Sequence, residues 1–216
     1  MVIDAFCIVA PILVRTEMLK RLDDRIYSRV KRFKRGTLFF MRDSLEYGKS
    51  ETVRKAFYRL TKAGKLRKRC AGIYYRPRKD SIFGPLTPGV DEVVKIIAKR
   101  KGFRVAPTGY HALNKLGLST KVVANYIYLT DGNTRRLKIG KTTVNFIRTS
   151  TKNVSAKGDI SHLAIQALRI IGKGSITEKE IRRIQHVLTF EHQENLKHDI
   201  KLAPIWIQKI IQPAIR

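Results

Sequence analysis

Polar side chains recur along residues 50–63 at the spacing of one helix face. Thr52, Lys55, Arg59 and Lys62 stand at positions i, i+3, i+7 and i+10, which places them along one side of an α-helix. Hydroxyl and cationic donors in this arrangement can hydrogen-bond to base edges and phosphates, and the major groove of duplex DNA admits one α-helix. The pattern therefore favours duplex DNA as a ligand.

The first turns of this helix are expected to lie nearest to the bases, because a recognition helix usually enters the groove by its N-terminal end. Phosphate contacts would follow further along the helix. We predict base-edge contacts from Ser50, Glu51, Thr52 and Lys55, and phosphate contacts from Arg59 and Lys62.

A basic β-hairpin is predicted directly after the helix. Residues 65–70 and 73–76 are extended runs on either side of Ala71-Gly72, as expected for two strands joined by a tight turn. Its cations suit backbone phosphates or an adjacent minor groove; the candidates are Lys65, Arg67, Lys68, Arg69 and Arg76. The alternative is that these side chains only solvate an exposed face, as most charge runs do.

The elements that must position these residues come in a specific order. Apolar residues at three- and four-residue steps predict a helix over residues 17–34, followed by a short strand at 37–40 and a short helix at 43–47. With the helix over 50–63 and the basic hairpin, this order is that of a winged helix-turn-helix. The order is more specific than any one segment.

The charge balance supports a polyanionic partner. The 216 residues include 45 Lys+Arg and 17 Asp+Glu, a net charge of +28, far more than solubility requires. Residues 15–80 alone hold 22 Lys+Arg against 7 Asp+Glu. A membrane surface is less favoured than a nucleic acid, because no lipidation signal is present, and two cysteines fit a reducing, cytoplasmic setting.

The chain is expected to form an α+β fold with two domains. An apolar extension at residues 1–16 precedes the winged helix at 17–80, and interruptions by Pro and Gly over 77–89 predict a connector. The extension lacks the features of a signal peptide, so we expect it to pack on the body or on a second subunit. The second domain, 81–216, is expected to hold helices at 90–101, 108–116, 161–171 and 178–188, an antiparallel meander of strands at 126–130, 135–139 and 143–148, and terminal helical pieces around Pro204.

Little in the sequence suggests catalysis, a metal or a cofactor. His186, His192 and His198 are six residues apart, a spacing that does not bring them to one helix face. Asp131 and Asn133 belong to a predicted turn, where such side chains usually bond to the backbone. No phosphate-binding glycine loop or nucleophile-base set is present. We therefore expect a protein that is not an enzyme and has no cofactor.

Two sets of motifs, spread over about residues 20–190, resemble the AbiEi-type antitoxins. The N-terminal set is Arg35-Gly36-Thr37-Leu38-Phe39, Ser50 to Leu60, Gly64-Lys65-Leu66 and Gly72-Ile73-Tyr74-Tyr75-Arg76-Pro77. The C-terminal set is Pro107-Thr108-Gly109, Ala112 to Thr120 and Tyr128-Leu129-Thr130-Asp131-Gly132.

The resemblance implies a bacterial type IV toxin-antitoxin system. Such an antitoxin represses its own operon through inverted-repeat DNA, on which a dimer could form, and counters a nucleotidyltransferase-like toxin encoded beside it. The apolar segment Met1 to Val14, and Lys121 with its neighbours where a Gln-containing stretch is expected, depart from the pattern. From the residues alone, a protein that binds tRNA or ribosomal RNA by shape remains the alternative.

Overall fold

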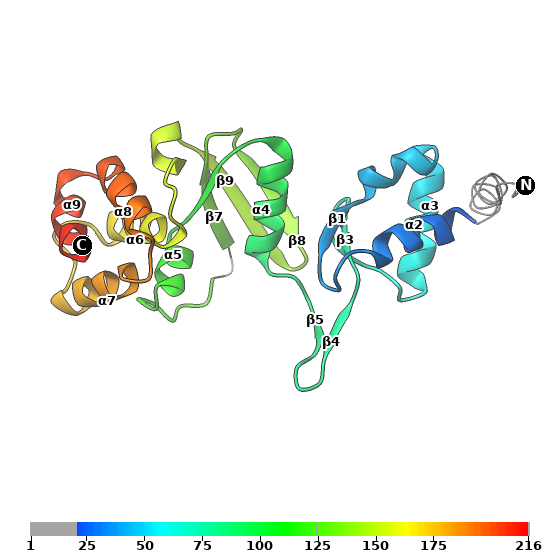
Figure 1. Ribbon diagram of the computed structural model, residues 1–216, viewed down its shortest axis with the longest axis horizontal. Coiled ribbons are helices and arrows are strands. Elements are labelled where there is room, and N and C mark those ends of the chain that lie inside the picture. The colour runs from blue at the N-terminus through cyan, green and yellow to red at the C-terminus, as the bar shows by residue number, and fades with distance from the viewer. Residues whose placement is uncertain (1–20, 124, 216) are drawn as a thin grey trace, which may run out of the picture. The chain divides into compact units, whose positions relative to one another are not determined.

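The computed structural model describes residues 21–123 and 125–215. The chain divides into two compact units, with the boundary between Val93 and Val94 (Figure 1). This boundary lies thirteen residues after the end of the predicted first domain, inside a helix rather than in a connector. The predicted extension at 1–16 and the first residues of the predicted helix 17–34 lie outside the described residues.

Between residues 21 and 93, the first unit contains two main helices and two small sheets. Its elements are α2 (Leu22–Lys31), β1 (Leu38–Phe40), the 3-10 helix η1 (Met41–Tyr47), α3 (Ser50–Lys62), β2 (Arg67–Cys70), β3 (Ile73–Tyr75), β4 (Arg78–Asp80) and β5 (Gly84–Leu86). The strands β1, β3 and β2 form one antiparallel sheet in that order. The helix, strand, helix and hairpin predicted from hydrophobic periodicity are all present.

The core of this unit forms where α2 and α3 pack on the sheet. Val53, Ala56, Phe57 and Leu60 of α3 are buried, and the ring of Phe57 lies 4.8 Å from that of Tyr74 on β3. The core also includes Ile26, Val30, Phe39 and Leu66. Because one face of α3 is buried in this way, its opposite face is left to solvent.

The segment over residues 77–89 is a β-hairpin, not the connector that its Pro and Gly content predicts. Strands β4 and β5 pair antiparallel, with Arg78 opposite Leu86 and Asp80 opposite Gly84. The turn is closed by Asp80, whose carboxylate accepts backbone hydrogen bonds from Ile82 and Phe83. Gly84 has φ of 69°, a conformation that favours glycine, so its presence here closes a turn rather than marking irregular chain.

The second unit is an α+β assembly of a four-stranded sheet and a helical C-terminal region. It comprises most of α4 (Val90–Lys101), then β6 (Val105–Thr108), α5 (Tyr110–Lys115), β7 (Asn125–Thr130), β8 (Arg135–Ile139), β9 (Thr142–Arg148), η2 (Thr151–Val154), α6 (Asp159–Ile171), α7 (Glu178–Leu188), α8 (Gln193–Asp199), η3 (Ile200–Leu202), α9 (Ile205–Ile211) and η4 (Gln212–Ala214). The strand at 105–108 was not predicted from the sequence.

The antiparallel meander predicted for β7, β8 and β9 is wrong. The sheet order is β6-β7-β9-β8, and β7 pairs parallel to β9, with Tyr128 opposite Phe146. This order places the buried Val144 and Phe146 of β9 in the sheet interior and leaves β8, with exposed Arg136 and Lys138, at the edge. Charged side chains are tolerated at an edge strand and blunt its tendency to pair further.

The C-terminal helices enclose a core of their own. Ile184 and Leu188 of α7, Leu196 of α8 and Ile207 of α9 are among its buried residues, and Trp206 packs against them. The predicted capping box at the start of α7 is confirmed: the Thr177 side chain accepts from the Glu180 backbone, and the Glu180 side chain accepts from the backbone of Thr177.

Candidate nucleic-acid interface

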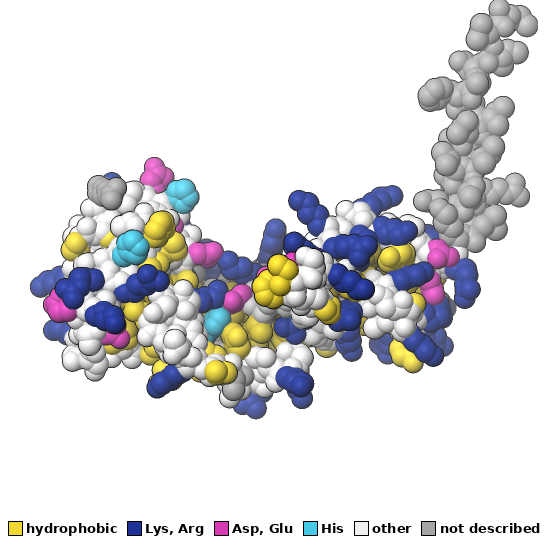
Figure 2. All heavy atoms as spheres, turned by 90° about the horizontal axis from the view of Figure 1, so that it is seen from below, with side chains coloured by type: hydrophobic (Ala, Val, Ile, Leu, Met, Phe, Trp, Pro, Cys, Tyr) yellow, Lys and Arg dark blue, Asp and Glu magenta, His cyan; other side chains and the backbone are white. Residues whose placement is uncertain are grey.

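The outward face of α3 is polar and open. Ser50, Glu51, Thr52, Lys55, Arg59 and Lys62 are all exposed, so the six residues predicted on this helix are accessible and lie on one element. Over the first unit, at the right of Figure 2, Lys and Arg side chains cover much of the visible face. A surface of this kind attracts anions over a distance of about a Debye length, roughly 8–10 Å at physiological salt.

Two of these residues form an exposed ion pair. Lys55 Nζ lies 3.0 Å from Glu51 Oε1, one helical turn away. Exposed pairs of this spacing contribute only about 0.3–0.5 kcal/mol, so an anionic ligand could replace Glu51 as the partner of Lys55 at little cost. Glu51 also provides an acceptor near the start of the helix, the end expected to approach base edges.

Arg59 is exposed but already paired with a side chain of the same unit. Its Nε lies 2.7 Å from Asp23 Oδ2 and its Nη2 lies 2.6 Å from Asp23 Oδ1, so the guanidinium holds α2 against α3 in a bidentate pair. The hydrogen bond from Arg59 holds the pKa of Asp23 below its usual range. The predicted phosphate contact from Arg59 therefore competes with a structural partner 36 residues away in sequence.

Sequence reasoning missed two exposed residues on the outward side of α3, Tyr58 near its centre and Arg54 toward its edge. Arg54 is exposed and Tyr58 is 67% exposed. At about 100° per residue, Tyr58 lies roughly opposite the buried face, between Arg54 and Lys62 at four-residue steps. The signal was available, since any residue of α3 that is off the face of the buried Val53, Phe57 and Leu60 is expected to be exposed, whether or not it falls in the spacing of the cations.

The β2–β3 hairpin offers a second group of accessible cations. Arg67 and Lys68 on β2 are exposed, and so is Lys65 just before it. Lys65 Nζ and Lys31 Nζ lie 5.2 and 5.0 Å from the centre of the Tyr27 ring, within the range in which a ring attracts an ammonium group. Gly72, at φ 71°, closes the turn, which lets the hairpin remain short.

The other two predicted hairpin cations stabilise the unit itself. Arg69 sits where the β2–β3 register shifts, and its Nε donates to the Pro88 carbonyl at 2.8 Å. Arg76 Nη1 donates to the carbonyls of Lys31 and Phe33 at 2.9 and 3.1 Å, which satisfies acceptors at the C-terminal end of α2. The exposed cations that are left for a ligand are therefore Lys55, Lys62, Lys65, Arg67 and Lys68, with Arg54 added.

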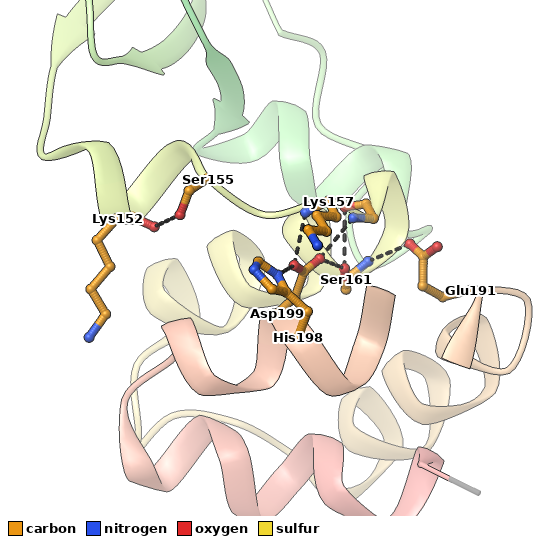
Figure 3. Close-up of polar contacts among 8 residues, drawn as sticks. Lys152, Ser155, Lys157, Ser161, Glu191, His198 and Asp199 are labelled. Atoms are coloured by element: carbon orange, nitrogen blue, oxygen red, sulfur yellow. Dashed lines mark hydrogen bonds and ion pairs between the residues drawn. The ribbon is translucent and has the colours of Figure 1, made fainter. Parts of the chain in front are cut away.

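A buried polar cluster lies at the start of α6. Asp199 Oδ2 accepts hydrogen bonds from Ser161 Oγ and the Gly158 backbone, and Asp199 Oδ1 lies 2.7 Å from His198 Nδ1 (Figure 3). Glu191 accepts from the Ser161 backbone. Ser161 contacts the carboxylate directly and is fully buried, unlike a nucleophile activated by histidine. The two carboxylates instead satisfy backbone donors at the helix N-terminus.

The described residues offer no grouped metal ligands. Within residues 21–123 and 125–215, no three His, Cys, Asp or Glu side chains are placed so that they could hold a metal ion. None of the helices described there combines the length and apolar content needed to cross a bilayer. The Asp131 carboxylate accepts from the Arg104 backbone at 2.8 Å, so it bonds to the main chain, though not within its own turn.

Comparisons with known proteins give a family and a distant structural likeness. Residues 25–196 match DUF6088, a family of unknown function. No curated protein matches the sequence. The crystal structure of the RV2827C protein from Mycobacterium tuberculosis is similar at 12% identity and a TM-score of 0.46, over 90% of this chain and 82% of that chain.

Proposed function

The chain belongs to the DUF6088 family, and from its own residues we propose that it binds duplex DNA through a winged helix-turn-helix in its first unit. In this proposal α3 enters the major groove and the β2–β3 hairpin is the wing. The observation that carries the proposal is the exposed polar face of α3 next to the exposed cations Lys65, Arg67 and Lys68.

The arrangement of elements supports this assignment. A short helix, η1, precedes α3, and α3 is followed at once by a hairpin whose strands pair with β1 in the order β1-β3-β2. The apolar side of α3 is held in the core by Val53, Phe57 and Leu60. A helix fixed on one side can present polar side chains to base edges without losing its position.

Contacts within this interface divide by chemistry. Thr52, Lys55 and Arg54 lie on α3, where they could reach base edges or nearby phosphates. Arg67 and Lys68 lie on the wing, where cations contribute affinity that depends little on sequence. Arg59, Arg69 and Arg76 support the fold of the reading unit through the bonds described above.

We further propose that the protein represses its own operon and acts as the antitoxin of a type IV toxin-antitoxin pair, with a nucleotidyltransferase-like toxin as its functional partner. This part rests on the resemblance of residues 20–190 to AbiEi-type antitoxins. A repressor of this class would bind an inverted repeat, so two copies on one operator are expected.

The test is a footprint on the DNA upstream of the protein's own gene. Protection of an inverted repeat, absent from a scrambled duplex of the same composition, is the expected result. Structured RNA at equal nucleotide concentration should compete only weakly with the upstream duplex for the protein. If RNA competes better than the upstream duplex and no repeat is protected, the protein is an RNA-binding protein and the proposal is wrong.

A further inference from the structure

The β4–β5 hairpin ends in two large apolar side chains that no described residue of the first unit covers. Ile82 is 83% exposed and Phe83 is 78% exposed. Both stand in the turn between Asp80 and Gly84, at the end of a hairpin that projects from the body of the unit (Figure 1). Exposed aromatic and aliphatic side chains placed together at a tip are a recurring mark of interaction sites.

The tip is held in a defined shape. Asp80 Oδ1 accepts from the backbone N–H groups of Ile82 and Phe83 at 2.9 and 3.1 Å. These hydrogen bonds keep the pKa of Asp80 below its usual range, so the carboxylate remains charged and able to accept both bonds at neutral pH. The two apolar side chains are therefore presented on an ordered turn rather than on a loose loop.

The base of the hairpin is fastened to the body that carries α3. Arg69 Nε donates to the Pro88 carbonyl at 2.8 Å, after β5, and Arg35 Nη1 donates to the Pro77 carbonyl at 3.4 Å, before β4. Tyr75 Oη lies 3.4 Å from Thr87 Oγ1. Because hydrogen bonds hold both ends of the hairpin to the rest of the first unit, the position of the tip is tied to that of the body that carries α3.

The surroundings of the tip favour an anionic partner. Arg78 and Lys79 of β4 are exposed, so cations flank the apolar residues. A stable protein interface usually covers about 800 Å² on each partner, much more than two side chains on a narrow turn provide. Duplex DNA matches both features of the tip. Apolar side chains such as Phe and Ile can insert between base pairs from the minor groove, while cations beside them contact the flanking phosphates.

We propose that the β4–β5 hairpin is a DNA wedge, in which Ile82 and Phe83 insert between base pairs from the minor groove and Arg78 and Lys79 contact adjacent phosphates. The proposal rests on the DNA-binding function proposed above and extends it: the protein bends the duplex that it binds. Flexible pyrimidine-purine steps such as TA are the expected insertion points, because unstacking them costs least.

The experiment uses the full chain and a duplex of about 30 base pairs, roughly three helical turns, with one central TA step. Bending is measured by energy transfer between dyes at the duplex ends, and unstacking by the fluorescence of 2-aminopurine next to the TA step. The wild-type protein should shorten the end-to-end distance and raise the 2-aminopurine signal. The double variant Ile82→Ser/Phe83→Ser should lose both effects and bind about tenfold more weakly.

Two further variants separate the wedge from other causes. Phe190→Ser/Ile205→Ser removes apolar residues that are also exposed, at 71% and 73%, and should leave bending and affinity unchanged. Arg78→Gln/Lys79→Gln should reduce the magnitude of the salt slope of binding by up to about 1.8, since each phosphate that is no longer neutralised removes about 0.9. The tip variant should leave the slope unchanged.

Distinct outcomes would overturn the wedge and the DNA-binding function. If the wild type binds the duplex and the tip variant binds and bends it equally well, the wedge is wrong and the DNA-binding function stands. If the tip variant instead converts a dimer to a monomer in light scattering, with bending unchanged, the tip contacts a second copy and the wedge is again wrong. If the wild type binds no duplex, both proposals fail.

Discussion

Arg59 on α3 and Asp23 on α2 form a bidentate pair, with nitrogen-to-oxygen distances of 2.7 and 2.6 Å. The pair joins the helix proposed to read DNA to the helix packed against it. Two parallel hydrogen bonds between a guanidinium and a carboxylate fix the relative orientation of the two side chains and also stabilise the contact between α2 and α3. The position of α3 therefore depends on a residue that sequence spacing alone places among the phosphate contacts.

Replacing Arg59 should affect folding more than phosphate binding. Arg59→Ala removes the partner of Asp23, so the melting temperature should fall, while the salt slope of duplex binding should change by less than the roughly 0.9 expected for a phosphate contact. Arg54→Ala on the same helix is the matched control: its side chain is exposed, so the slope should change and the melting temperature should not. Equal effects of the two variants on both quantities would contradict these roles.

Asp23→Asn tests the same pair from the other side. Because the pKa of Asp23 is lowered by the hydrogen bond from Arg59, the carboxylate stabilises the folded state above its unfolded pKa, near 3.9. That contribution is lost as the pH falls through the lower folded pKa. The variant should therefore be less stable than the wild type at pH 7, and the difference should shrink below about pH 4. Thermal unfolding of both proteins between about pH 2 and 7 measures this difference in stability. If the difference did not change with pH, the ionised pair would not be its cause.

Base contacts and phosphate contacts should separate by their dependence on DNA sequence. Thr52→Ala and Lys55→Ala should reduce the preference for the operator over scrambled duplex by about 1–3 kcal/mol for each base that the variant no longer reads. Arg67→Ala and Lys68→Ala should weaken binding to both duplexes alike and reduce the magnitude of the salt slope by about 0.9 each. Titrations of each variant with the two duplexes measure this difference, and equal behaviour of the two pairs would mean that α3 does not face the bases.

Tyr58 should contribute to DNA binding without contributing to folding. Its ring is 67% exposed at the centre of the outward face of α3, so Tyr58→Ala leaves the core intact, and the melting temperature should stay within the range of ordinary surface substitutions. Duplex affinity should fall severalfold. Phe57→Ala is the contrasting variant: Phe57 is fully buried, and its loss should cost about 3–5 kcal/mol of stability.

Asp199 should be essential to the stability of the second unit. Burial alone would raise the pKa of Asp199, but hydrogen bonds from Ser161, His198 and two backbone N–H groups outweigh burial and lower it. Asp199→Asn cannot satisfy all these donors, and unsatisfied buried groups cost about 1–3 kcal/mol each. We expect a loss of about 2–4 kcal/mol in denaturant unfolding at pH 7. The loss should shrink as the pH falls through the folded pKa, because the wild-type carboxylate becomes protonated there.

The matched control for Asp199 is Asp159→Asn in the same unit. Asp159 pairs with Lys95 at 2.9 Å on the surface, and exposed pairs contribute about 0–1 kcal/mol. The control should therefore unfold at nearly the wild-type denaturant concentration. If the two variants were equally stable, the carboxylate of Asp199 would not be supporting the start of α6.

Local patterns in the sequence predicted the elements that local physics decides. The buried face of α3 follows from Val53, Phe57 and Leu60 at helical spacing, and the start of α7 follows from Thr177 and Glu180 at capping-box spacing. In both cases the deciding residues lie within a few positions of each other.

Features set by partners far apart in sequence were missed. The pairing of β7 with β9 skips the strand between them, and turn residues alone favour the simpler hairpin order. Asp23 and Arg59 are 36 residues apart, so spacing could not reveal that the arginine is occupied. The β4–β5 hairpin was mistaken for a connector because proline and glycine usually interrupt periodic structure, whereas here Asp80 and Gly84 close an ordered turn.

The salt dependence of duplex binding by the full chain tests most directly whether the first unit binds DNA. The accessible cations of α3 and the β2–β3 hairpin, with further exposed Lys and Arg of the first unit, should neutralise about six to eight phosphates. We therefore predict a slope of log K against log salt concentration of about −5 to −7. A slope near zero, or no measurable binding to duplex DNA, would contradict the claim that this surface of the first unit binds DNA.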